Sequence, residues 1–106
     1  MDNKLAYLVE ILLPTRTGKG KAVGRDWFER LVRELTQNFG GATSFVRAPG
    51  EGLWQSGAET EHDNIVVIEV MTGSIDTAYW EKLRVRLEKE LSQEEIVVRC
   101  HQIRRL

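Results

Sequence analysis

Cysteine is scarce in this sequence, and its scarcity excludes several kinds of chemistry. Cys100 is the only cysteine among 106 residues, so a disulfide within the chain and a cysteine-based metal cluster are excluded. No apolar run approaches the roughly 18–20 residues that cross a bilayer. The first residues lack the regions of a secretory signal. We therefore expect one cytoplasmic domain, residues 1–106, with no metal, no cofactor and no membrane partner.

An excess of charge of one sign is also missing. Fifteen basic and 16 acidic residues leave a formal net charge of −1. A domain that binds phosphates usually has a clear basic excess. The RNA-binding domains that stack bases on a sheet need exposed aromatic residues, and residues 64–72 contain none. The composition thus argues against nucleic acid as a partner.

The hydrophobic pattern predicts four strands and two helices. Short apolar or alternating runs indicate strands at residues 5–13, 42–48, 64–72 and 95–104, and helical periodicity indicates helices at about 26–39 and 75–91. The order β-α-β-β-α-β is typical of an α+β protein with the ferredoxin-like split βαββαβ fold. That fold has a four-stranded antiparallel sheet of order 4-1-3-2, with both helices on one face.

Local signals define the helix ends and their buried sides. Asp26 and Glu29 have the spacing of a capping box, and Gly40 follows the first helix as a left-handed cap. Ser74 or Asp76 is expected to cap the second helix. The residues expected on the two buried sides are Phe28, Leu31, Val32, Leu35 and Phe39, then Ala78, Leu83, Leu87 and Leu91 with Tyr79 or Trp80.

The sheet face that points away from the helices is predicted to be unusually apolar. Side chains alternate along a strand, and this alternation places Cys100 inward as buried packing. A face open to water should be mostly polar, whereas a large apolar patch usually marks a partner surface. A second copy of the chain is therefore the expected cover. The apolar residues assigned outward are Leu8, Leu12, Ile65, Val67, Met71, Val97, Ile103 and Phe45.

Charged residues cross the same face in a row. The predicted strand order brings Arg99 and His101 beside Glu10, then Glu69, then Arg47. One interpretation is a row of salt bridges that fixes the register of a homodimer. The alternative is a ligand or catalytic pocket, because two neighbouring carboxylates raise one pKa towards the range of acid–base catalysis and a histidine can carry protons.

A basic, glycine-containing loop precedes the first helix. Its cationic side chains are Arg16, Lys19, Lys21 and Arg25, and no acid interrupts residues 15–25. Amides and lysines at this position can hold a phosphate or carboxylate. The spacing differs from that of a nucleotide-binding P-loop. The loop is either a flexible soluble connection or a site for an anion.

Three short motifs resemble a family of small uncharacterised bacterial proteins, classed as domains of unknown function. The motifs are Phe39-Gly40-Gly41-Ala42-Thr43, Gly52-Leu53-Trp54 and Gln93-Glu94-Glu95-Ile96, with an apolar strand led by Asp63 between the last two. The resemblance implies a ferredoxin-like architecture and a bacterial, cytoplasmic protein. It implies no activity.

Three functions are compatible with these patterns. The first is a homodimeric protein without an assigned activity that binds a small ligand at most. The second is a small enzyme of the dimeric α/β-barrel type, similar to cofactor-free monooxygenases or isomerases, that uses the open sheet face. The third is an anion- or nucleotide-sensing module that uses residues Gly18–Lys21.

Overall fold

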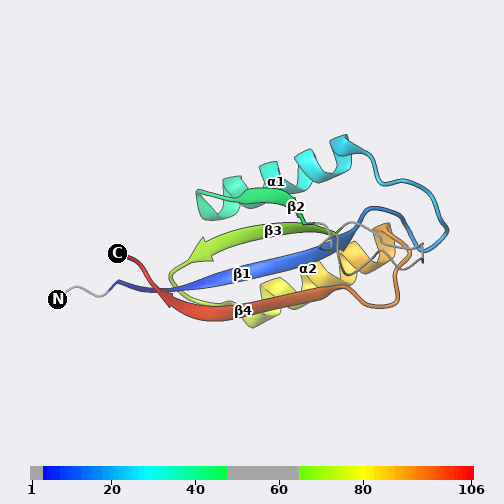
Figure 1. The fold of residues 1–106 in the computed structure, drawn as a ribbon. Helices are drawn as coiled ribbons and strands as arrows, with labels where there is room; N and C mark the ends of the chain where they lie inside the picture. Colours follow the sequence, from blue (N-terminus) through cyan, green and yellow to red (C-terminus); the bar gives the residue numbers. More distant parts are fainter. Residues whose placement is uncertain (1–3, 48–64) are drawn as a thin grey trace, which may run out of the picture.

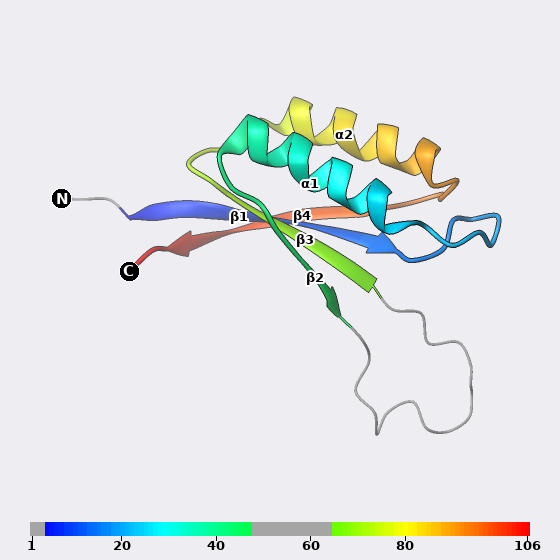
Figure 2. The same cartoon turned by 90° about the horizontal axis from the view of Figure 1, so that it is seen from above.

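The protein is an α+β domain, as the sequence predicted. The computed structural model describes residues 4–47 and 65–106. The sheet is antiparallel throughout, with the strand order β2-β3-β1-β4 (Figure 1), and both helices lie on the same side of it (Figure 2). The elements are β1 (Leu5–Pro14), α1 (Arg25–Phe39), β2 (Thr43–Arg47), β3 (Ile65–Thr72), α2 (Thr77–Glu90) and β4 (Val97–Arg104). Neither helix is both long and apolar enough to span a membrane within the described ranges.

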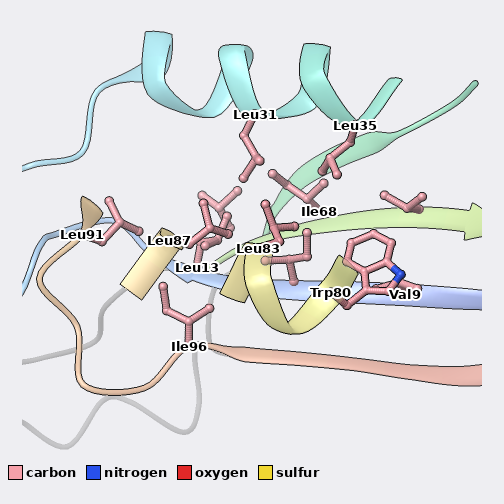
Figure 3. Packing of buried hydrophobic residues seen from close by; sticks show 13 residues of the cluster. Val9, Leu13, Leu31, Leu35, Ile68, Trp80, Leu83, Leu87, Leu91 and Ile96 are labelled. Atoms are coloured by element: carbon pink, nitrogen blue, oxygen red, sulfur yellow. The ribbon is translucent and has the colours of Figure 1, made fainter. Parts of the chain in front are cut away.

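The hydrophobic core lies between the two helices and the inner face of the sheet. The central strand β1 contributes Val9, Ile11 and Leu13, each at most 1% exposed. These residues alternate with Leu8, Glu10 and Leu12 on the other face, as the sequence pattern predicted. Figure 3 shows the cluster that they form with side chains of both helices; its remaining buried members are Leu31, Leu35, Val66, Ile68, Val70, Trp80, Leu83, Leu87, Leu91 and Ile96.

Two of the three helix caps predicted from the sequence are confirmed. Gly40 ends α1 with a φ of 81°, in the left-handed region that glycine adopts without steric cost, and Asp76 caps α2 by accepting from the Tyr79 N–H at 3.2 Å. The predicted capping box at Asp26 is wrong, because Gly24 is the N-cap and its position carries no side-chain cap. Asp26 lies inside the first turn, where its charge still favours the helix dipole.

The buried side of α2 is narrower than predicted. Trp80, Leu83 and Leu87 are buried, whereas Ala78 is exposed. Successive residues are about 100° apart around a helix, so Ala78 lies roughly opposite Trp80.

On the outer side of α2, Arg86 forms a bidentate pair with Glu34 of α1, at 2.7 and 3.0 Å. Its hydrogen bond lowers the pKa of Glu34 and ties the two helices together.

Glu88 links α2 to the start of β4. Its Oε2 accepts from the backbone N–H of Ile96 and from the Arg84 guanidinium, both at 2.9 Å. The Ile96 N–H is the main cause that lowers the pKa of Glu88, and Arg84 adds to it. Because the folded pKa lies below the unfolded one, ionised Glu88 stabilises the fold at neutral pH, and this contribution is lost as the pH falls through the folded pKa.

The Glu88→Gln variant should therefore be less stable than the wild type at pH 7, and the difference should shrink as the pH is lowered below the ordinary glutamate pKa of about 4.3. Urea unfolding between pH 7 and pH 3, followed by circular dichroism, measures this difference in the free energy of unfolding. Glu81→Gln, at an exposed position of the same helix, is the control and should show no such trend. An equal difference at every pH would contradict this role for Glu88.

Candidate functional site

The face of the sheet that points away from the helices is the candidate functional site, and we call it the open face. Strand register places its residues directly opposite one another: Leu8 faces Met71 and His101, and Leu12 faces Val67 and Val97. Neither α1 nor α2 covers this face (Figure 2). Its described members are Ala6, Leu8, Glu10, Leu12, Thr43, Ile65, Val67, Glu69, Met71, Val97, Arg99, His101 and Ile103.

Apolar surface is exposed around the open face rather than at its centre. Val67 has no exposed surface, whereas Ile65, Met71 and Val97 are 37%, 46% and 43% exposed. The apolar character that the sequence predicted is therefore present in the fold. These three side chains lie on β3 and β4 and form the apolar rim of the face.

A carboxylate is held at the middle of the open face. Glu10 lies directly opposite Glu69 on β3 and Arg99 on β4. The Arg99 Nε donates to Glu10 Oε1 at 2.7 Å, a charge-assisted hydrogen bond. Only 12% of the Glu10 side chain is exposed, against 52% for Arg99. Two carboxylates directly opposite one another repel, so the guanidinium supplies the opposite charge that makes this arrangement tolerable.

The predicted row of charges is confirmed at three positions and corrected at the ends. Arg99, Glu10 and Glu69 are consecutive across β4, β1 and β3, but the residue opposite Glu69 on β2 is Thr43. Arg47 pairs with Ile65, four residues further along β2. The alternation of side chains predicts which residues of β2 share a face, but it does not predict which residue of β3 each of them pairs with. His101 shares the face and lies opposite Leu8, not Glu10.

A hollow of about 470 Å³ opens at the end of the face where β2 begins. Glu69 and Thr43 line it together with Leu8 and Met71, and the turn between α1 and β2 forms its far wall. Glu10 is not part of its lining. Of the carboxylates predicted to form a pocket, Glu69 is therefore the one that a molecule in this hollow would contact.

The basic loop is a compact turn fastened to the end of α2. The backbone N–H groups of residues 17–21 all donate to protein acceptors, among them the Thr17 hydroxyl, which accepts from Lys19 and Lys21, and the carbonyl of Leu91, which accepts from Gly18 at 2.9 Å. These amides are thus not free to bind an anion. The side chains predicted to bind one, Arg16, Lys19, Lys21 and Arg25, are on exposed residues, and their binding of an anion stays a prediction.

The sequence predicted both the side of the sheet and the burial of Cys100, and only the side is confirmed. Cys100 lies on the helix side, opposite Val9, as predicted, but it is exposed and not buried. Strand β4 is at the sheet edge, and α2 covers it only in part.

The motif Gly52-Leu53-Trp54 and Asp63 lie outside the described residues. Within the described ranges, no group of three or more metal-binding side chains comes together.

Comparisons of the chain with protein-family models, with curated proteins and with solved structures found no match. The function therefore has to be inferred from the geometry of the open face and its surroundings.

The Arg99→Gln variant should remove the guanidinium that pairs with Glu10 opposite Glu69. We expect it to lower the free energy of unfolding by about 1 kcal/mol, since Arg99 is half exposed and solvent weakens the pair. Adding Glu69→Gln should recover part of this loss, while Glu69→Gln alone should not stabilise the wild type to the same extent. Urea unfolding of the wild type, the two single variants and the double variant gives the coupling energy between Arg99 and Glu69. Strictly additive effects would contradict the proposed charge balance.

The Gly18→Ala variant tests how the basic loop is fastened. A Cβ at Gly18 would lie 1.7 Å from the carbonyl oxygen of Ser92, so the loop or the end of α2 must move. Forced overpacking of this kind typically costs about 1–3 kcal/mol of stability. Gly73→Ala is the matched control, because nothing lies within 4 Å of its Cβ position. Chemical denaturation compares the two variants; a loss of stability of equal size in both would refute the close contact.

Proposed function

We propose that the protein is a homodimer of ferredoxin-like subunits that associate through the open face. The feature that carries the proposal is an apolar rim around a half-buried ion pair, on a sheet face that neither helix covers. The order β-α-β-β-α-β and the strand order β2-β3-β1-β4 support the split βαββαβ fold. We further propose that the chain is related to the uncharacterised bacterial family that its short motifs resemble.

The open face is large enough for a dimer interface. Strands of 10, 5, 8 and 8 residues, about 4.8 Å apart and with a rise of about 3.3 Å per residue, give a flat area of roughly 500 Å² per copy. Two copies together bury about 1,000 Å², which is near the lower limit for a specific interface. Apolar side chains at the rim supply the driving force that such a small interface needs.

The charges of the open face are complementary to a rotated copy of themselves. The β4 side carries Arg99 and His101, and the β3 side carries Glu69. A two-fold axis parallel to the strands and over β1 exchanges these two sides. Arg99 of one copy then lies over Glu69 of the other, and a closed, isologous dimer results. The row of charges would thereby fix the register of the two sheets.

The hollow beside Glu69 supports a second candidate, a small-ligand or catalytic site on the same face. Its volume of about 470 Å³ is within the usual range of small-molecule pockets. A carboxylate and the Thr43 hydroxyl are the polar groups that it offers from the open face. If the protein is an enzyme, this hollow is its active site, and Glu69 acts there as the acid or base.

Val97→Glu tests the dimer, because it places a charge on the apolar rim. We expect at least a tenfold weaker dimerisation constant in sedimentation velocity over a concentration series, since the charge enters the interface twice and must lose water. Val85→Glu is the matched control: Val85 lies on α2 and is 43% exposed, like Val97.

The control should dimerise like the wild type. A wild type that remains monomeric at all concentrations would overturn the homodimer and leave the Glu69 hollow as the remaining candidate. Equal effects of the two substitutions would show that the interface lies elsewhere.

A further inference from the structure

The outer edge of β4 is long and regular. β4 is the outermost strand of the sheet (Figure 1), and among the described residues it pairs only with β1. This pairing runs over eight consecutive residues without a bulge, and the strand contains no proline. Bulges, prolines and covering segments are the usual means of closing such an edge, because its free backbone groups can pair with another strand. The edge of β4 can therefore accept a further strand.

The hydrogen bonds to β1 show which residues of β4 face this edge. The Arg105 N–H donates to the Lys4 carbonyl at 2.8 Å. Hydrogen-bonded pairs of an antiparallel ladder recur at every second residue, so the odd-numbered residues of β4 bond to β1. The backbone N–H and C=O groups of the even-numbered residues point to the outer edge; these residues are Val98, Cys100, Gln102 and Arg104.

A groove of about 300 Å³ lies beside this edge, between the first turns of α2 and the middle of β4. Cys100 and Val98 line it from the strand, and the apolar side chains of Ile75 and Trp80 line it from the other side. Residues that pair across two strands have their side chains on the same face of the sheet. A strand that pairs with Cys100 would thus direct one side chain towards this groove, whose lining favours an apolar residue.

The charges of β4 and of the residues after it have one sign. Residues 97–106 include Arg99, Arg104 and Arg105 and no acid. Arg99 pairs with Glu10, whereas Arg104 is exposed and forms none of the ion pairs found among the described residues. A second copy of β4 at this edge would double the positive charge, and an acidic strand would balance it. Charge complementarity therefore favours an acidic partner over a second copy.

We propose that the edge of β4 binds an extended acidic segment of another protein, which adds an antiparallel strand to the sheet. Its backbone pairs with the even-numbered residues of β4. One apolar side chain, opposite Cys100, enters the groove, and an acidic residue four positions earlier faces Arg104. In complexes of this kind the backbone hydrogen bonds give affinity, and the pockets for alternate side chains give specificity. The proposal goes beyond the homodimer and does not depend on it, because the open face and the β4 edge are different surfaces.

Amide exchange with water tests the pairing directly. The probe is the capped peptide Glu-Glu-Val-Thr-Glu-Val-Thr-Val-Thr, whose second residue is designed to lie opposite Arg104 and its sixth opposite Cys100. In the free protein, nitrogen-15 spectra should show fast exchange for the even-numbered amides of β4 and slow exchange for the odd-numbered ones. Peptide at about 1 mM should slow the even-numbered amides roughly tenfold, as expected for a dissociation constant of about 100 μM.

Two results of this experiment would overturn the proposal. One is unchanged exchange of the even-numbered amides in the presence of the peptide. The other is slow exchange without the peptide that becomes slower as the protein concentration rises, since this would assign the edge to a second copy. A peptide with an N-methyl group on its sixth residue is the control, because it lacks the N–H that donates to the Cys100 carbonyl. It should bind roughly tenfold more weakly, and equal binding would refute strand pairing.

Two matched substitutions test the side-chain contacts. Arg104→Gln should weaken binding of the peptide at least threefold, whereas Arg30→Gln, the same change at an exposed position of α1, should not. Equal losses would show that general charge, and not the position of Arg104, attracts the peptide. Serine in place of the sixth peptide residue should weaken binding more than serine in place of the third, which lies opposite Ile103 on the other face. Equal losses for these two peptides would refute the role of the groove.

Discussion

The two sides of the central strand β1 have different environments, and this difference is the main constraint on the fold. One side belongs to the core, and the other side carries the ion pair between Glu10 and Arg99. Strand β1 pairs with both β3 and β4, and its inward residues are almost fully buried beneath the helices. On the opposite side the same strand holds a carboxylate that is only 12% exposed, between leucines. A carboxylate so poorly solvated needs a cation or a donor nearby, and Arg99 supplies one at 2.7 Å.

The helix side is organised around α2 and its connection to β4. Glu88 binds the backbone at Ile96, and Gly18 brings the basic loop against the turn that follows the helix. These contacts fix both ends of the α2–β4 connection. Strand β4 is at the sheet edge, however, and α2 does not cover its middle, where Cys100 is exposed and the groove above Trp80 opens. The exposed large hydrophobic residues are nevertheless spread over several elements: Leu5 lies on β1, Ile65 and Met71 on β3, Val85 on α2 and Val97 on β4.

Hydrophobic alternation was sufficient to predict the two faces of β1, β3 and β4, because one buried face specifies register strongly. It did not predict the position of β2, where Thr43 and not Arg47 lies opposite Glu69. The residues between β2 and β3 are too many to fix a register by turn geometry alone. The exposure of Cys100 also escaped prediction, since alternation tells which side a residue points to and not whether a helix reaches it. Nothing in the sequence signals that Trp80 Nε1 lacks an acceptor among the described residues, because that depends on how the indole packs.

The most direct test of the account is whether the open face is covered in solution. Methyl-resolved nuclear magnetic resonance with a soluble paramagnetic agent compares the relaxation of the valine methyl groups in the wild type. If a second copy covers the face, the methyl groups of Val97 become protected as the protein concentration rises, while those of the equally exposed Val85 on α2 stay accessible. Equal accessibility of the two valines at every concentration would contradict the central claim.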